Sequence, residues 1–214
     1  SYGFKNNALP RLIASLRTQI NAADIVVVVG NSTTEGVESL SDYTLVKVKH
    51  NSMDFTALIG VIDNQSNLGT LPDYWFYMHD TCLAGPNFIS NLNTKTINTD
   101  IRVHWSTNLG IFRNSTLLSN SSLINSYKSS DNPNHVEDRV NKYKSVCDKK
   151  KIFETINCRS DLCSEMPVIS PNTSAIYNNV QRQTIYFEEL DFYKYNSNFV
   201  WARRYDPPRF NRYP

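Results

Sequence analysis

The residues best placed to do chemistry are His79 and Asp80, which directly follow a run of five large apolar side chains at positions 74–78. A run this short and this apolar predicts a strand buried on both faces, as in a parallel sheet. In open α/β sheets, ligands bind beyond the carboxyl ends of the strands. An aspartate there can hold a divalent cation, and the cation can hold a diphosphate. The competing interpretation is that Asp80 caps the next turn through an Asx hydrogen bond.

Two further groups of carboxylates are candidates for acid or base chemistry. Glu137 and Asp138 fall in the first turn of a helix predicted to begin near residue 134. Acidic side chains are favoured in that turn by the helix dipole, whatever the function. Because a long polar segment precedes the helix, the same pair could instead face a cleft. The acidic residues within 188–191 have apolar neighbours, which a strand with alternating exposure explains.

The remaining motifs exclude several classes of enzyme. Adjacent strand residues point to opposite faces, so at most one of His79 and Asp80 faces a ligand while the strand continues. His104 lies in an aromatic segment and is interpreted as a core or cleft histidine. No Ser/His/Asp or Cys/His arrangement supports nucleophilic hydrolysis. The glycine patterns of Rossmann and P-loop sites are missing from the sequence.

Length, charge and cysteine usage favour one globular domain. The chain has 214 residues and a net charge of +2, which does not favour nucleic acid as a partner. No apolar run is long enough to span a membrane. The four cysteines lack zinc-site spacing, so no zinc is expected. Free thiols fit a reducing compartment, so we expect a soluble, cytoplasmic protein.

Strand and helix patterns alternate through the first half of the chain. The spacing of leucine and isoleucine predicts a helix over residues 7–20, and residues 24–29 and 44–48 are typical of buried strands. A helix capped by Ser52 precedes the strand at residues 74–78. This alternation predicts an α/β fold with a mostly parallel central sheet flanked by helices.

The second half of the chain is less regular. Residues 101–105 and 109–113 are expected to form strands, and the serine- and asparagine-rich residues 114–132 an exposed, mobile loop. Residues 183–195 predict a strand followed by a helix or turn. The last twelve residues, 203–214, have the proline-rich composition of a tail or of a linker to a missing domain.

The order of these pieces resembles the nucleotide-sugar half of GT-A glycosyltransferases, a family that algal DNA viruses also encode. The matching pieces are the helix at residues 7–20, the valine strand ending in Gly30-Asn31-Ser32, and the aromatic strand ending in His79-Asp80-Thr81. The resemblance implies a single GT-A-like domain over residues 1–202. Residues 1–100 would bind the nucleotide sugar, and residues 101–202 the acceptor.

The resemblance also implies a set of site residues. GT-A enzymes end the fourth strand in an Asp-x-Asp motif that binds Mn²⁺ or Mg²⁺. Asp80 matches the last aspartate of that motif and Met78 replaces the first. The residues implied in donor binding are Ser1, Tyr2, Gly3, Asn31, His79 and Asp80. Those implied in the donor and acceptor pocket are His104, Asn108 and Gly110. The resemblance implies Asp138 as the catalytic base, and Glu137 is the second candidate for that role.

The implied function is metal-dependent transfer of a sugar from a nucleoside-diphosphate donor, with UDP as the commonest case, to a hydroxyl of a glycan or glycoprotein. The position of Asp138 implies inversion at the anomeric carbon. A viral protein of this kind would work in the cytoplasm of its host cell, with further domains as possible partners. The alternatives are a non-catalytic nucleotide-sugar-binding domain of the same fold and then a nucleotidyltransferase. Nucleotidyltransferases usually have a glycine-rich loop with basic residues after the first strand, and this sequence has no such loop there.

Overall fold

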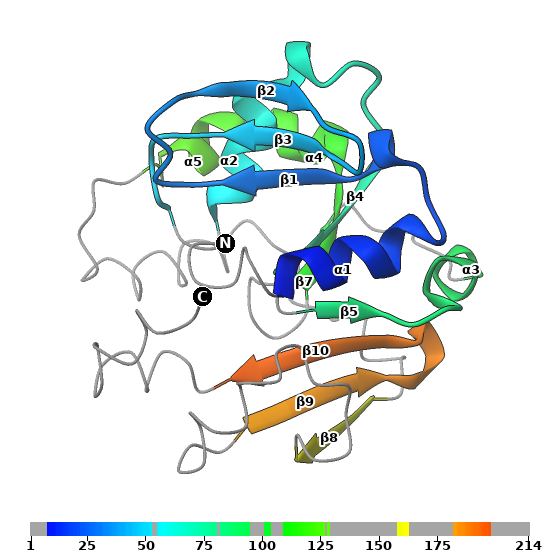
Figure 1. The fold of residues 1–214 in the computed structure, drawn as a ribbon. Helices are drawn as coiled ribbons and strands as arrows, with labels where there is room; N and C mark the ends of the chain where they lie inside the picture. The colour runs from blue at the N-terminus through cyan, green and yellow to red at the C-terminus, as the bar shows by residue number, and fades with distance from the viewer. Residues whose placement is uncertain are drawn as a thin grey trace, which may run out of the picture.

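The computed structural model describes residues 8–52, 55–80, 82–94, 101–103, 109–126, 128, 158–162 and 182–197. Within these residues the chain is a mixture of short helices and short strands, grouped into three small sheets (Figure 1). The sheets have the strand orders β1-β3-β2, β4-β7-β6 and β5-β10-β9-β8, and none of them is closed. The coarse α/β prediction is therefore confirmed.

The first sheet contains β1 (Val26–Val29), β2 (Gly36–Ser39) and β3 (Thr44–Lys47). β1 pairs with β3 in parallel, and β2 pairs with β3 antiparallel. Helix α2 (Phe55–Asp63) contacts β1 and β3. Gly60 fits closely because a Cβ there would lie 2.6 Å from the Cγ1 atom of Val28. The predicted strands at residues 24–29 and 44–48 and the helix after Ser52 are confirmed.

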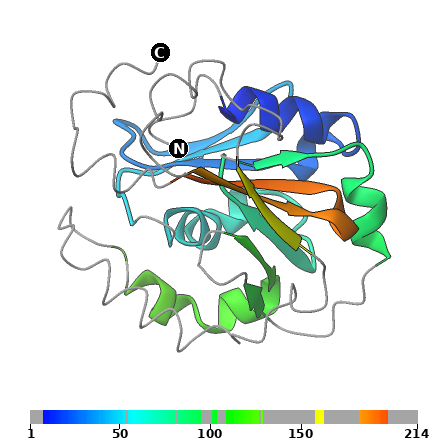
Figure 2. The same ribbon diagram turned by 90° about the horizontal axis from the view of Figure 1, so that it is seen from below.

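Helix α1 (Ala8–Arg17) confirms the helix predicted over residues 7–20. Its buried side chains, Leu12, Ile13 and Leu16, belong to the larger of two apolar clusters. Ile25 and Val27 of the β1 region join that cluster. Seen from below, α1 and the green helices of residues 114–125 lie on opposite sides of the strands (Figure 2).

The second sheet corrects the prediction of a mostly parallel sheet. β4 (Tyr74–Met78) pairs antiparallel with β7 (Leu109–Arg113), which pairs antiparallel with β6 (Ile101–Val103). Every residue of β4 is only half-buried, so the prediction of burial on both faces was also wrong. Periodicity reports apolar faces, and it does not report the direction of the neighbouring strand, which depends on residues far away in sequence.

The third sheet joins β5 (Cys82–Ala84) to the hairpin of β9 (Arg182–Phe187) and β10 (Phe192–Ser197), with β8 (Cys158–Leu162) at its edge. All its pairings are antiparallel. The strand predicted within 183–195 is confirmed. The segment after it is a short 3-10 helix, Glu188–Leu190, and then a second strand. Glu188 and Glu189 therefore lie in a turn rather than in an alternating strand.

Asp191 closes that turn and connects it to β5. Its backbone has a positive φ of 53°, which an aspartate tolerates better than most residues. The Asp191 carbonyl accepts a hydrogen bond from the Gly85 N–H at 2.7 Å, and its carboxylate accepts one from the Asn87 N–H at 3.0 Å. Asp191 is thus occupied in holding the hairpin against the segment that follows β5.

Residues 114–125 correct another prediction, because they form helices instead of an exposed loop. α4 (Asn114–Ser119) follows β7 directly, and α5 (Ser121–Asn125) follows α4. Each buries one apolar side chain, Leu117 in α4 and Ile124 in α5, in the second apolar cluster beside α2. None of the helices in the described ranges is both long and apolar enough to cross a membrane.

Candidate functional site

A pocket of about 720 Å³ lies between β1 and β4. Helix α1 contributes Leu9, Leu12 and Leu16 to its lining, and α2 contributes Thr56, Leu58 and Val61. Consecutive residues of both strands also line it, along with the polar residues that follow each strand. We call this cavity the strand-end pocket.

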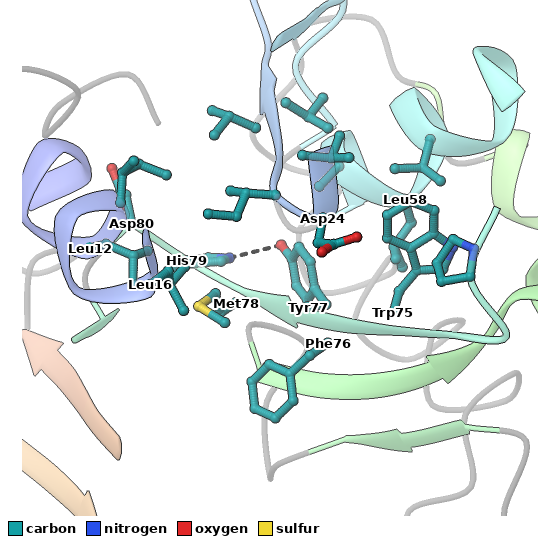
Figure 3. A pocket seen from close by; sticks show the side chains of 18 of the residues that line it. Leu12, Leu16, Asp24, Leu58, Trp75, Phe76, Tyr77, Met78, His79 and Asp80 are labelled. Atoms are coloured by element: carbon teal, nitrogen blue, oxygen red, sulfur yellow. Dashed lines mark hydrogen bonds between the residues drawn. The ribbon is translucent and has the colours of Figure 1, made fainter. Parts of the chain in front are cut away.

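The side chains of β4 divide between the two apolar clusters (Figure 3). Phe76 and Met78 pack against the cluster that contains α1. Trp75 and Tyr77 pack against the cluster that contains α2, and Figure 3 shows Trp75 beside Leu58. The row of β4 side chains therefore forms one wall of the pocket, with a helix on each face of the strand.

Asp80 lies at the polar end of this row and lines the pocket, as Leu12 of α1 also does (Figure 3). Its Oδ2 atom is shielded from solvent and has no hydrogen-bond partner. No Asx bond to a described residue caps the following turn, so the geometry does not support the capping interpretation. A buried carboxylate oxygen without a donor is unfavourable, and a cation or a ligand donor would remove that cost.

His79 points back along β4 to Tyr77. Its Nε2 atom and the Tyr77 hydroxyl lie 3.0 Å apart, and their rings meet edge to face. The bond fixes the direction of the imidazole, and the tautomer decides which of the two atoms donates. His79 and Asp80 both line the strand-end pocket.

Asn31 follows β1 as Asp80 follows β4, and it lines the same pocket. It adopts a left-handed backbone with a φ of 56° and donates its N–H to the His50 carbonyl at 3.2 Å. At Gly30, a Cβ would lie 2.8 Å from the His50 carbonyl oxygen. This glycine therefore permits a close approach between two segments of the protein.

The charged side chains of the described pocket lining are acidic. Asp24 and Asp80 are its two carboxylates, and no lysine or arginine of the described residues lines it. A phosphate group would be repelled by this lining unless a divalent cation came with it. The described residues contain no group of three or more His, Cys, Asp or Glu side chains that could hold a metal by themselves.

The other predicted site residues divide into two sets. Gly110 is buried at the centre of the second sheet, where it pairs with both Tyr77 and Val103, and it does not line the pocket. The residues that lie outside the described ranges are Ser1, Tyr2, Gly3, His104, Asn108, Glu137 and Asp138. The structure therefore brings together Asn31, His79 and Asp80.

Sequence reasoning missed several polar contributors to the pocket, among them Asp24 and Thr56. Asp24 is predicted only as the start of a strand, although a carboxylate directly before Ile25 and four valines marks the polar end of an apolar run. Thr56 was treated only as part of a helix. Its hydroxyl accepts a hydrogen bond from the Ser52 N–H at 2.8 Å, which fixes the beginning of α2. The side chain of Cys82 is buried in the larger apolar cluster.

Comparisons with known proteins found no relative of this chain. The chain matches no family model, no curated protein and no solved structure. The site is therefore interpreted from its own residues and from the sequence resemblance alone.

Proposed function

We propose that this chain is a glycosyltransferase that uses a nucleoside-diphosphate sugar and a divalent cation. The observation that carries the proposal is the buried, unpartnered Oδ2 atom of Asp80 at the end of β4, in a pocket that Asn31 also lines. Asp80 is also the residue that matches the last aspartate of the GT-A metal motif. That the chain has the GT-A fold is also part of this proposal.

The residues present fit a cation that is shared with the donor. Mg²⁺ and Mn²⁺ can bind through one or two carboxylates while phosphates and water complete the coordination. Asp80 supplies one such ligand, and Met78 replaces the first aspartate of the family motif. When bound, the cation would offset the charge that develops on the departing diphosphate.

The remaining roles belong to this chain's own side chains. Asn31 and His79 would orient the donor at the strand ends, and the apolar walls would exclude water from it. Asp138 would take the proton of the acceptor hydroxyl as its oxygen bonds to the anomeric carbon. The bond from that carbon to the diphosphate oxygen breaks in the same step. UDP is the first donor nucleotide to test, and a glycan hydroxyl the expected acceptor.

The test is a calorimetric titration of UDP, GDP, TDP and CDP, each with Mn²⁺ and with EDTA. We expect one nucleotide to bind only with the cation, and Asp80→Asn to weaken it more than tenfold, or about 1.4 kcal/mol. Asp24→Asn is the matched control, because it neutralises the pocket's other carboxylate and should retain binding. If no nucleotide binds under any condition, the proposal is wrong.

A second candidate function is a non-catalytic nucleotide-sugar-binding domain. The observation that favours it is that the described residues place only one carboxylate at the end of β4. Turnover distinguishes the two functions once the nucleotide is known. The glycosyltransferase proposal expects transfer that Asp138→Asn slows by about 10²–10⁴-fold without weakening donor binding. Binding without transfer to any acceptor supports the second candidate.

A further inference from the structure

The backbone of His50 supports Asn31, which lines the strand-end pocket just beyond the end of β1. The His50 carbonyl accepts a hydrogen bond from the Asn31 N–H at 3.2 Å. The next amide, that of Ser32, donates instead to the Val48 carbonyl at 3.0 Å. A Cβ on Gly30 would lie 2.8 Å from the same His50 oxygen, so the two backbone segments touch. A movement of the His50 backbone would therefore be transmitted to Asn31.

Asn31 depends on this support because its backbone has an uncommon conformation. Its φ of 56° lies in the left-handed region, which asparagine enters more readily than most residues but still unfavourably. A residue keeps such a conformation only when the surrounding contacts hold it. Loss of the bond to His50 would let Asn31 adopt a more common conformation, and its side chain would then leave its position in the pocket lining.

The imidazole ring holds the His50 backbone in place through Ser52. Its Nδ1 atom lies 2.9 Å from the hydroxyl of Ser52, whose side chain is fully buried. The Ser52 N–H donates to the Thr56 hydroxyl at 2.8 Å, and the Ser52 carbonyl accepts from the Phe55 N–H at 3.0 Å. The ring therefore joins the segment that supports Asn31 to the buried first turn of α2.

Only the neutral form of the ring suits this position. The Nε2 atom of His50 is shielded from solvent and has no hydrogen-bond partner among the described residues. A charged imidazole carries an N–H on both nitrogens, so the N–H on Nε2 would be buried without an acceptor. Protonation therefore favours a ring that turns toward solvent and leaves Ser52.

The charged groups around His50 come from three parts of the fold. Burial lowers the pKa of His50 below 6.5, and the positive charge of Lys128, which follows α5, lowers it further. The negative charges of Asp63, at the end of α2, and of Glu35, which precedes β2, oppose this shift without reversing it. The folded chain therefore favours the neutral ring at neutral pH.

We propose that His50 is a positioning residue for the donor, and that its neutral ring keeps Asn31 in place in the pocket lining. The inference rests on the proposed function, in which Asn31 orients the donor. Acidification charges the ring, which breaks the contact with Ser52 and releases Asn31. Donor binding should therefore be full above pH 6.5 and weaken as the pH falls toward the pKa of folded His50.

Amide hydrogen exchange of the 214-residue chain, followed by NMR without a ligand, tests the support of Asn31. The Ser32 amide is the internal control, because its bond does not involve His50. We expect His50→Leu to speed exchange at Asn31 by about tenfold or more, and at Ser32 by less than about threefold. His50→Asn should leave both rates unchanged, because the new amide nitrogen takes the place of Nδ1. Ser52→Ala removes the same contact from the other side and should reproduce the effect of His50→Leu.

The pH dependence distinguishes this positioning role from a merely structural one. In the unmodified chain, the amide shift of Asn31 should follow the titration of the His50 ring. Calorimetric affinity for UDP with Mn²⁺, or for whichever of GDP, TDP and CDP binds instead, should fall at the same midpoint by at most about tenfold per pH unit, the limit for one proton. His50→Asn should retain the affinity at neutral pH and lose this part of the fall. Lys128→Ala should move the midpoint to higher pH, because it removes a positive charge that opposes protonation.

Two results would overturn the proposal. The first is an Asn31 amide that exchanges at the same rate in the unmodified chain, in His50→Leu and in Ser52→Ala. The second is a nucleotide affinity that has the same pH dependence in His50→Asn as in the unmodified chain. If no nucleotide binds at all, the glycosyltransferase proposal is wrong. The Asn31 amide would still decide, without a ligand, whether His50 holds the pocket lining in place.

Discussion

α2 and the pair α4–α5 are neighbouring helical regions of opposite composition. Seven of the nine residues of α2 are buried, and its sequence is almost wholly apolar. α4 and α5 are made mainly of serine, asparagine and threonine, and each buries a single residue. The difference shows that one buried apolar side chain per helix can anchor a polar segment when a neighbouring apolar helix supplies the surface.

Polar contacts between the two regions add little to those anchors. The Asn125 amide donates to the Asp63 carboxylate at 3.0 Å, and the Lys128 ammonium lies 2.9 Å from the same group. The Asp63 and Lys128 side chains are 29% and 46% exposed, so solvent screens the pair. Ion pairs of this kind contribute about 0.2–1 kcal/mol. The apolar anchors Leu117 and Ile124 therefore provide most of the attachment.

The largest effect is expected from truncating the apolar helix. Ile59 is fully buried, and Ile59→Ala should lower the free energy of unfolding by about 2–5 kcal/mol, because it leaves a cavity in a packed site. The matched control is Leu123→Ala on α5, where the side chain is 41% exposed and the expected change is within about 0.5 kcal/mol. Denaturant titration measures both. Equal losses would mean that the two regions do not differ as described.

An intermediate effect is expected from removing one anchor of the polar pair. Leu117→Ala should release α4 and α5 locally, so the global loss should be about 1–3 kcal/mol, less than for Ile59→Ala. Hydrogen exchange distinguishes the two cases. Amides of residues 114–126 should lose protection while those of α2 keep it. Uniform loss of protection across both regions would show that the pair is an integral part of the core.

The same contrast explains how much of the fold could be predicted from sequence. α1, α2 and β1 carry apolar residues at regular spacing, so their positions followed from periodicity. α4 and α5 each carry two adjacent apolar residues and bury only one of them, and so few apolar positions show no helical period. The direction of the strand beside β4 could not be predicted for another reason, because that strand lies more than 30 residues away in sequence.

The candidate site was predictable only where it lies at the end of a strand. Asp80 and Asn31 were found because each lies just beyond the end of an apolar run. That both line one pocket depends on how β1 and β4 sit between α1 and α2, which no local pattern specifies. Asp138 and Glu137 lie outside the described residues, so their part in the site remains a prediction carried by the resemblance.

The smallest effect concerns His50, which lies near the junction of the two helical regions. Burial lowers the pKa of His50 below its ordinary value of 6.5, and Lys128, which follows α5, lowers it further, while Asp63 and Glu35 oppose the shift. The geometry agrees with this direction. The Nδ1 atom lies 2.9 Å from the Ser52 hydroxyl, whereas Nε2 is buried without a partner, so a proton there would have no acceptor.

Because the folded state binds this proton less tightly than the unfolded state, stability should be full above pH 6.5 and fall as the pH drops toward the folded pKa. Denaturant midpoints measured across that window should show the fall in the unmodified chain. His50→Gln should remove that contribution, and Lys128→Ala should reduce it in part, because it removes the nearby positive charge that comes from the polar region. If the pH dependence is unchanged in His50→Gln, the contribution comes from other groups. If it is unchanged in Lys128→Ala, the Lys128 charge has no electrostatic effect on His50.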